Sequence, residues 1–345
     1  PPSRVFLGWP LRADSWRDGA APAQAAFTEL AALLAQFEAV TVIVDAGASA
    51  AVLDAAKAAI SAATAGAAFG VEVVAMPCDD CWVRDSGPTF AVEDGALVAH
   101  QWGFNAWGGL YTPCDKDRGL PPLMAAHVGA RHVDHSGEVV LEGGAIHVDG
   151  RGAVMVTESS VFADNRGNTG GKAIMEPVLA GALGVSRFVW LPRGLLADTD
   201  TLGHVDNLAA FTPGGGVALA FTEWEEATVE ARRVLTAAGF DVHVVPLPTG
   251  RFAAPRAAHE ADGLSGREVG ELLAASYLNF LVLNGGIVMP SYGGEDDTVA
   301  AAAVGTLFPG RRVCQLSPAA SREILLGGGN IHCVTQQVPV ADAKT

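Results

Sequence analysis

The chain has 345 residues, half of them apolar, so it is long enough for one large domain or two ordinary ones with a substantial core. Its 22 Lys and Arg residues against 38 Asp and Glu residues give a formal charge of −16, which argues against nucleic acid as the main partner. No apolar run reaches the roughly eighteen residues of a membrane span, and five cysteines in so long a chain indicate a reducing cytoplasm.

The first third of the chain alternates strand and helix patterns. Apolar, β-branched runs predict buried strands, and one segment places Phe27, Leu30 and Leu34 on the same face of a helix. In chain order we expect strands at residues 5–9, 40–44 and 71–76, and helices at residues 23–37 and 49–63. This alternation is typical of an α/β fold.

From residue 89 onward one unit recurs, namely two strands joined by a tight turn, then a helix, then a strand. The first turn carries Asp94-Gly95, a dipeptide that suits a hairpin. Strand pairs are expected at residues 89–92 and 96–102, 145–148 and 153–157, 205–211 and 217–221, and 277–283 and 287–290. Helices are expected at residues 172–183, 223–238 and 297–307, and closing strands at residues 187–191, 241–246 and 312–316.

One repeat is visible in the letters themselves. Leu141-Glu-Gly-Gly-Ala-Ile-His147 is similar to Leu326-Gly-Gly-Gly-Asn-Ile-His332. Comparable segments recur about five times, near Asp85, Glu142, His204, Gly285 and Cys333. Chance matching of glycine turns is the alternative. No linker, composition break or charge block divides the chain, so a single domain over residues 1–345 is expected.

Three glycines precede Cys333, and glycine lets a backbone turn sharply and approach a ligand closely. Ile331 and Val334 anchor the flanks of this cysteine. The pattern favours a thiol presented to a ligand, although a free cysteine is more often a small buried apolar residue. A nucleophilic thiolate would also need a base or a positive environment.

Two further loops carry groups suited to chemistry. Asp85 follows Trp82 and Arg84 in a loop that ends in Gly-Pro; the alternative is a turn cap with Arg84 as its structural partner. Glu142 precedes two glycines, and surface solvation is the ordinary explanation for a glutamate.

A third loop carries His204 and Asp206. If a strand begins there, both side chains point to the same face, because side chains alternate along a strand. By the same reasoning, His332 and Cys333 would point to opposite faces of a strand. His204 is therefore the better candidate for the base that serves Cys333.

Carboxylates around a thiol disfavour the thiolate, because like charges raise the thiol pKa. If Asp85, Glu142 and Asp206 gather around Cys333, a positive group must enter the site. A guanidinium fits, since it is planar, charged and donates to carboxylates in pairs. The predicted reaction is attack of sulfur on the guanidinium carbon, loss of ammonia with a proton from His204, and hydrolysis of the covalent thiouronium to a ureido product.

A series of motifs spans nearly the whole chain: Gly8-Trp-Pro10, Asp14-Ser-Trp-Arg17, Trp82-Val-Arg-Asp-Ser-Gly-Pro-Thr-Phe90, Trp102-Gly-Phe-Asn-Ala-Trp-Gly-Gly109, Leu141-Glu-Gly-Gly-Ala-Ile-His-Val-Asp149, Gly203-His-Val-Asp-Asn207, Ala275-Ser-Tyr-Leu-Asn-Phe280, Asn284-Gly-Gly286 and Gly327-Gly-Gly-Asn-Ile-His-Cys-Val-Thr-Gln-Gln337. Together they resemble the agmatine deiminase family of the guanidine-modifying, or pentein, superfamily, which also includes arginine deiminases. The resemblance implies a five-bladed α/β propeller with fivefold pseudosymmetry, built from ββαβ-type modules, and neither a metal nor an organic cofactor.

By motif position, the resemblance implies that Cys333 is the nucleophile and His204 the general acid and base. It implies that Asp85 and Asp206 bind the guanidinium, and that Glu142 positions the histidine or the substrate.

The resemblance also places Trp82 in the pocket wall and Gly328 in the substrate site. The implied reaction converts agmatine and water to N-carbamoylputrescine and ammonia, a step toward putrescine in polyamine biosynthesis. The family also suggests a homodimer, with no nucleic acid or membrane as a partner.

Three alternatives stay open: a deiminase acting on free or peptidyl arginine, a non-catalytic guanidine-binding protein, and a metal hydrolase. The last is disfavoured because Cys78 and Cys81 form a CxxC with no second pair at a useful spacing. An acidic group should bind the distal ammonium of agmatine, whereas free arginine would need a cation for its carboxylate. The sequence assigns neither group, since Leu202 and the loop at residues 291–297 depart from the family pattern.

Overall fold

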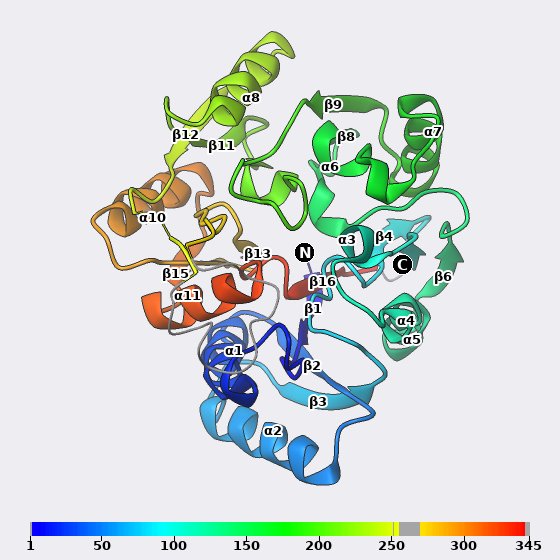
Figure 1. Ribbon diagram of the computed structural model, residues 1–345, viewed down its shortest axis with the longest axis vertical. Coiled ribbons are helices and arrows are strands. Elements are labelled where there is room, and N and C mark those ends of the chain that lie inside the picture. Colours follow the sequence, from blue (N-terminus) through cyan, green and yellow to red (C-terminus); the bar gives the residue numbers. More distant parts are fainter. Residues whose placement is uncertain (1, 251, 255–269, 342–345) are drawn as a thin grey trace.

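The computed structural model describes residues 2–250, 252–254 and 270–341, so both ends of the expected domain lie outside the described residues. Five small sheets surround a common centre like the blades of a propeller (Figure 1). This arrangement confirms the five-module α/β propeller expected from the sequence.

The first blade joins the two ends of the described chain. It contains β16 (Thr335–Pro339), β1 (Pro2–Gly8), β2 (Ala39–Asp45) and β3 (Val71–Met76), with helices α1 (Ala21–Leu34) and α2 (Ala50–Ala63). The strand order is β16-β1-β2-β3, in which β16 is antiparallel to β1 and the other two pairs are parallel. Val5 lies opposite Gln337, so pairing of the last strand with the first closes the ring.

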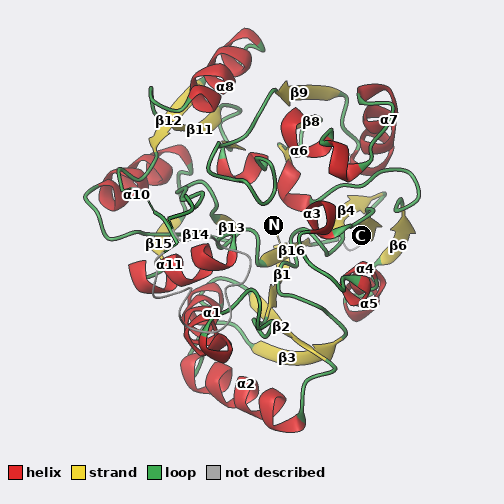
Figure 2. Ribbon diagram, in the orientation of Figure 1, coloured by secondary structure: helices red, strands yellow, loops and turns green. Residues whose placement is uncertain are grey.

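Each of the other four blades repeats an antiparallel strand pair, a helix, and a third strand parallel to the second. Their strands are β4 (Thr89–Glu93), β5 (Ala96–Gln101) and β6 (Arg131–Asp134); β7 (Ile146–Val148), β8 (Ala153–Thr157) and β9 (Arg187–Leu191); β10 (Ala209–Phe211), β11 (Val217–Phe221) and β12 (Val242–Pro246); and β13 (Leu281–Leu283), β14 (Gly286–Met289) and β15 (Arg312–Gln315). Their crossover helices are α5 (Leu120–His127), α7 (Lys172–Leu183), α8 (Glu226–Ala237) and α10 (Asp296–Leu307). Figure 2 shows α2, α7, α8 and α10 toward the outside of the ring.

The remaining elements lie within the blades or between them. They are α3 (Ala106–Gly109), α4 (Asp115–Arg118), α6 (Glu158–Val161) and α11 (Pro318–Gly327), together with the 3₁₀ turns η1 (Asp18–Ala20), η2 (Gly143–Ala145), η3 (Asp164–Arg166) and η4 (Val205–Asn207). Helix α11 leads from the fifth blade back to β16 at the centre (Figure 1).

The cores of the blades are apolar. Residues 40–44 of β2 are all buried, as expected for a parallel strand covered on both faces. Helix α1 buries Phe27, Leu30 and Leu34 in the same cluster. Full burial of one such side chain contributes about 1.5–3 kcal/mol. No helix within the described ranges combines the length and apolarity needed to cross a membrane.

Three local predictions are wrong. The strand expected at residues 277–283 begins only at Leu281. Val205–Asn207 is a 3₁₀ turn, and the strand begins only at Ala209, because the His204 amide donates to Asp198 Oδ2 (2.9 Å) and Thr201 Oγ1 (3.0 Å) instead of to a neighbouring strand. Residues 331–334 also form a turn, so the alternation of side chains along a strand does not apply there.

Candidate active site

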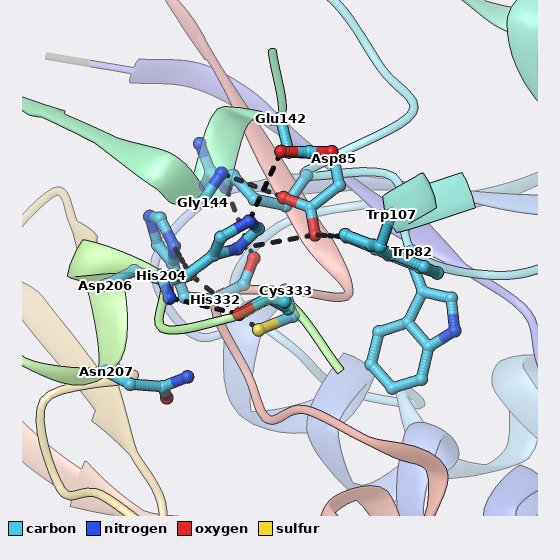
Figure 3. Close-up of polar contacts among 12 residues, drawn as sticks. Trp82, Asp85, Trp107, Glu142, Gly144, His204, Asp206, Asn207, His332 and Cys333 are labelled. Atoms are coloured by element: carbon cyan, nitrogen blue, oxygen red, sulfur yellow. Dashed lines mark hydrogen bonds and ion pairs between the residues drawn. The ribbon is translucent and has the colours of Figure 1, made fainter. Parts of the chain in front are cut away.

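The segment that precedes the first strand of each sheet points to the centre of the ring. We call these segments the inner turns, residues 82–88, 140–145, 203–208, 276–280 and 330–334, which lead into β4, β7, β10, β13 and β16. Between them they deliver Asp85, Glu142, His204 with Asp206, Asn279, and Cys333. The fifth blade thus contributes Asn279, not a residue near Gly285. Figure 3 shows the side chains from the other four inner turns converging.

The glycines before Cys333 serve close packing. A Cβ atom on Gly329 would lie 2.7 Å from the Trp82 ring and 3.0 Å from Cys333 Sγ, so only glycine fits there. Cys333 is 6% exposed, so the thiol lies at the bottom of a pocket and is not displayed on the surface.

The Cys333 thiol lies between an amide donor, which favours its anion, and a carboxylate, which disfavours it. Its Sγ lies 3.3 Å from Asn279 Nδ2 and 3.7 Å from Asp206 Oδ2. Burial, followed by the negative charges of Asp206 and Asp85, raises the Cys333 pKa well above its usual value. A bound cation is therefore needed to make the thiolate accessible near neutral pH.

His204 lies between two carboxylates. Its Nδ1 is 3.8 Å from Asp85 Oδ2 and its Nε2 is 3.6 Å from Glu142 Oε2, and neither ring nitrogen makes a hydrogen bond within the described protein. Burial lowers the His204 pKa, but the charges of Asp85, Glu142 and Asp206 outweigh it and raise the pKa to about 9. His204 is therefore a proton donor at neutral pH.

Asp85 is fixed by two donors. Its Oδ1 accepts from the Gly144 amide (2.8 Å) and its Oδ2 from Trp107 Nε1 (3.1 Å). Burial, together with Asp206 and Glu142, raises the Asp85 pKa to about 6 against the opposing charge of His204.

Gly144 occupies the middle of this cluster. A Cβ atom there would lie 2.6 Å from His204 Nδ1 and 2.9 Å from oxygens of both Asp85 and Asp206. The absence of a side chain therefore lets the three groups approach one another.

Asp206 also contacts the histidine next to the cysteine. Its Oδ2 accepts from His332 Nδ1 (2.8 Å), while its buried Oδ1 has no partner within the described residues. Burial and the positive charges of Arg84 and His204 lower the His332 pKa well below its usual value, so this imidazole is neutral. The prediction that His332 and Cys333 point to opposite faces is wrong, because the turn brings both to the same Asp206 oxygen.

A narrow pocket, with a volume of about 30 Å³, leads to the cysteine. Trp82 stacks on Trp16 at 5.6 Å and meets the edge of Trp107. The pocket is lined by Trp82, Asp85, Trp107, Leu110, Asp200, Thr201, Gly327, Gly328 and Cys333. Its described lining thus holds two carboxylates and no lysine or arginine.

The predicted site residues come together, but in two groups. Trp82, Asp85, Gly328 and Cys333 line the pocket, whereas Glu142, His204 and Asp206 lie beside it. His204 faces Asp85 and Glu142, and Asp206 faces Cys333. The sequence prediction missed Trp107, Gly144, Asp200 and Asn279. Three of them fall within recognised motifs and were not assigned a role there, whereas Asp200 lies outside them.

Within the described ranges, no three His, Cys, Asp or Glu side chains form a group that could hold a metal. Cys78 and Cys81 are both buried and free.

Comparison with known proteins finds a family model, related sequences and solved structures that all belong to deiminases. The model of the Porphyromonas-type peptidyl-arginine deiminase family matches residues 1–339. The agmatine deiminase of Pseudomonas putida is 39% identical over 98% of this chain and 93% of that protein. The agmatine deiminase of Pseudomonas savastanoi is 40% identical, with the same coverage. The solved structure of Enterococcus faecalis agmatine deiminase superposes with a TM-score of 0.88 at 33% identity, covering 99% of this chain and 94% of that chain.

Proposed function

From the membership of this chain in the Porphyromonas-type peptidyl-arginine deiminase family, we infer that it is an agmatine deiminase, a hydrolase that converts agmatine and water to N-carbamoylputrescine and ammonia. The observation that carries the choice of substrate is the pocket lining, in which carboxylates occur without a basic residue. Agmatine is positive at both ends, so both ends suit such a pocket. The carboxylate of free arginine would enter it without a cationic partner.

Asp200 is the group that we assign to the distal ammonium. It lines the same pocket as Asp85 and Cys333, and is partly exposed. In this arrangement the guanidinium reaches Asp85 and Asp206, and the alkyl chain of agmatine lies against the pocket walls that Trp82 and Trp107 form. Two carboxylates at separate positions of one narrow pocket match a diamine-like cation.

The first half of the reaction forms a covalent adduct. The bound guanidinium stabilises the Cys333 thiolate, whose proton passes to solvent, because it places a positive charge beside a thiol whose pKa is raised by burial and by carboxylates. The sulfur then attacks the guanidinium carbon, forming a C–S bond and a tetrahedral adduct. His204 donates its proton to one nitrogen, the C–N bond breaks, and ammonia leaves.

The second half restores the thiol. His204, now neutral, takes a proton from a water molecule, whose oxygen attacks the thiouronium carbon. The C–S bond breaks, the hydroxyl proton of the adduct passes to the departing sulfur, and the ureido product leaves, while His204 keeps the proton that it took from water. Glu142 keeps the imidazole in place through both halves, since it lies 3.6 Å from Nε2.

Peptidyl arginine is the second candidate substrate, because the family model carries that name. Incubation with agmatine, free arginine and a peptide with an internal arginine, followed by assay of ammonia and ureido product, separates the candidates. We expect the largest kcat/KM for agmatine. Faster turnover of the peptide would overturn the substrate but leave the chemistry intact. Binding of all three without turnover would favour a non-catalytic guanidine-binding protein.

We also propose a cytoplasmic location, because all five cysteines are free. A homodimer is the assembly that the family resemblance suggests, and light scattering on the purified protein would test it.

A further inference from the structure

Arg166 is a buried guanidinium beside the active site that the reaction scheme does not use. It lies at the end of η3 and is 2% exposed. Its Nε donates to Glu142 Oε1 (2.7 Å), Nη1 to the Trp107 carbonyl (2.7 Å) and Asn165 Oδ1 (2.9 Å), and Nη2 to the Thr201 carbonyl (3.1 Å). One side chain therefore joins three segments that are distant in sequence.

Each of the three segments contacts His204 or Asp85. Glu142 faces His204, the indole of Trp107 donates to Asp85, and the Thr201 hydroxyl accepts from the His204 amide. Trp107 and Thr201 also line the substrate pocket, whereas Arg166 does not. Arg166 thus acts through other residues and does not touch the substrate.

The pairing with Glu142 is not explained by stability alone. Removing two charges from water costs several kcal/mol per ion, and apolar pairs of similar size are often as stable. Here Arg166 occupies one carboxylate oxygen only, and the second, Glu142 Oε2, has no hydrogen-bond partner within the described protein and faces His204. The arrangement holds a negative oxygen toward the imidazole.

We propose that Arg166 is a positioning residue with two separable effects: its charge moderates the effect of the Glu142 carboxylate on His204, and its fork of donors fixes the pocket walls at Trp107 and Thr201. The proposal rests on the inferred deiminase reaction for its kinetic consequences. Its electrostatic part concerns only the protonation of His204, which can be measured without any turnover of substrate.

Several charged groups set the protonation of His204. Asp85, Glu142 and Asp206 favour the imidazolium, and the neutral His332 lies nearby. Among them, Glu142 is the group that Arg166 contacts directly.

Arg166→Gln removes the charge and Arg166→Lys retains it without the fork. In Arg166→Gln, we expect the midpoint of the His204 titration, followed by NMR, to rise by about one pH unit, because the negative charge of Glu142 is no longer shared with a buried guanidinium. The basic limb of kcat should move with this midpoint, and kcat at neutral pH should fall by about ten- to a hundredfold because Gln cannot supply the fork of donors that fixes Trp107 and Thr201. In Arg166→Lys, the midpoint should stay near the wild-type value while KM for agmatine rises.

A double variant separates positioning from plain structural damage. If Arg166 acts on His204 through Glu142, Arg166→Gln should have little effect on the His204 midpoint in a Glu142→Gln background. This double variant leaves no unpaired buried charge, so it also serves if Arg166→Gln alone does not fold. Arg17→Gln, which breaks the ion pair with Glu323 away from the pocket lining, is the matched control and should leave the midpoint unchanged.

Three results would overturn the proposal: an unchanged His204 midpoint in folded Arg166→Gln, a midpoint shift that persists in the Glu142→Gln background, or equal shifts in Arg166→Gln and Arg166→Lys. Failure of the wild-type protein to hydrolyse agmatine would instead count against the proposed function, because the NMR titration does not require turnover.

Discussion

The two similar heptads, residues 141–147 and 326–332, play complementary parts at the centre of the ring. Each brings a glycine, Gly144 or Gly329, so close to the reacting groups that a Cβ atom would clash. The first heptad carries its functional side chain, Glu142, before the glycines, whereas the second is followed by Cys333. In both heptads the glycine allows close approach, and a nearby residue supplies either a carboxylate or a thiol.

The largest expected effect is at the thiol. Cys333→Ala should lower agmatine turnover by about 10⁴-fold or more, because no other described side chain is placed to attack the guanidinium carbon. Calorimetric binding of agmatine should persist, since the carboxylates are intact. Turnover within tenfold of wild type would contradict the thiol mechanism.

The next largest effects are expected at Gly144 and Gly329, and they differ in kind. Gly144→Ala should reduce kcat about a hundredfold or more, because its methyl group would displace His204, Asp85 and Asp206. Gly329→Ala should instead slow the alkylation of Cys333 by iodoacetamide, since its methyl group would crowd the sulfur.

Gly181 is the matched control for both glycines, because it lies in α7 with nothing within 4 Å of its expected Cβ atom. Gly181→Ala should leave kcat and alkylation unchanged. If Gly144→Ala behaves like this control, the inner turns do not set the site geometry.

The pH dependence of kcat/KM tests the protonation states of Asp85 and His204. Below pH about 6, protonation of Asp85 should weaken guanidinium binding, because its raised pKa lies there. Above pH about 9, His204 loses the proton that ammonia requires, so the rate should fall about tenfold per unit. A rate that still rises at pH 10 would mean that Cys333 must ionise before substrate binds.

The smallest effect is expected at the far end of the pocket. Asp200→Asn should raise KM for agmatine by about three- to tenfold with little change in kcat, because a partly exposed ion pair is worth about 1 kcal/mol. The KM for free arginine should not rise. An equal loss for both substrates would remove Asp200 from the ammonium site.

Much of this architecture was predictable because it depends on local patterns. Glycine turns, alternating strands and amphipathic helices mark the five modules, and the motif residues Asp85, Glu142, His204, Asp206 and Cys333 do meet at one centre.

Other features depend on contacts between distant segments. The 3₁₀ turn after His204 forms because Asp198 and Thr201 take its amide. Arg166 pairs with Glu142, 24 residues away, and with Trp107, 59 residues away. Such partners cannot be predicted from the periodicity of the sequence.

Rapid acid quenching of the enzyme with agmatine, followed by peptide mass mapping, tests the role of Cys333 most directly. We predict that the peptide containing Cys333 gains the mass of agmatine less ammonia during the first turnover and loses it as N-carbamoylputrescine appears. An adduct on another side chain, or product formation while the Cys333 peptide stays unmodified at every quench time, would contradict the account.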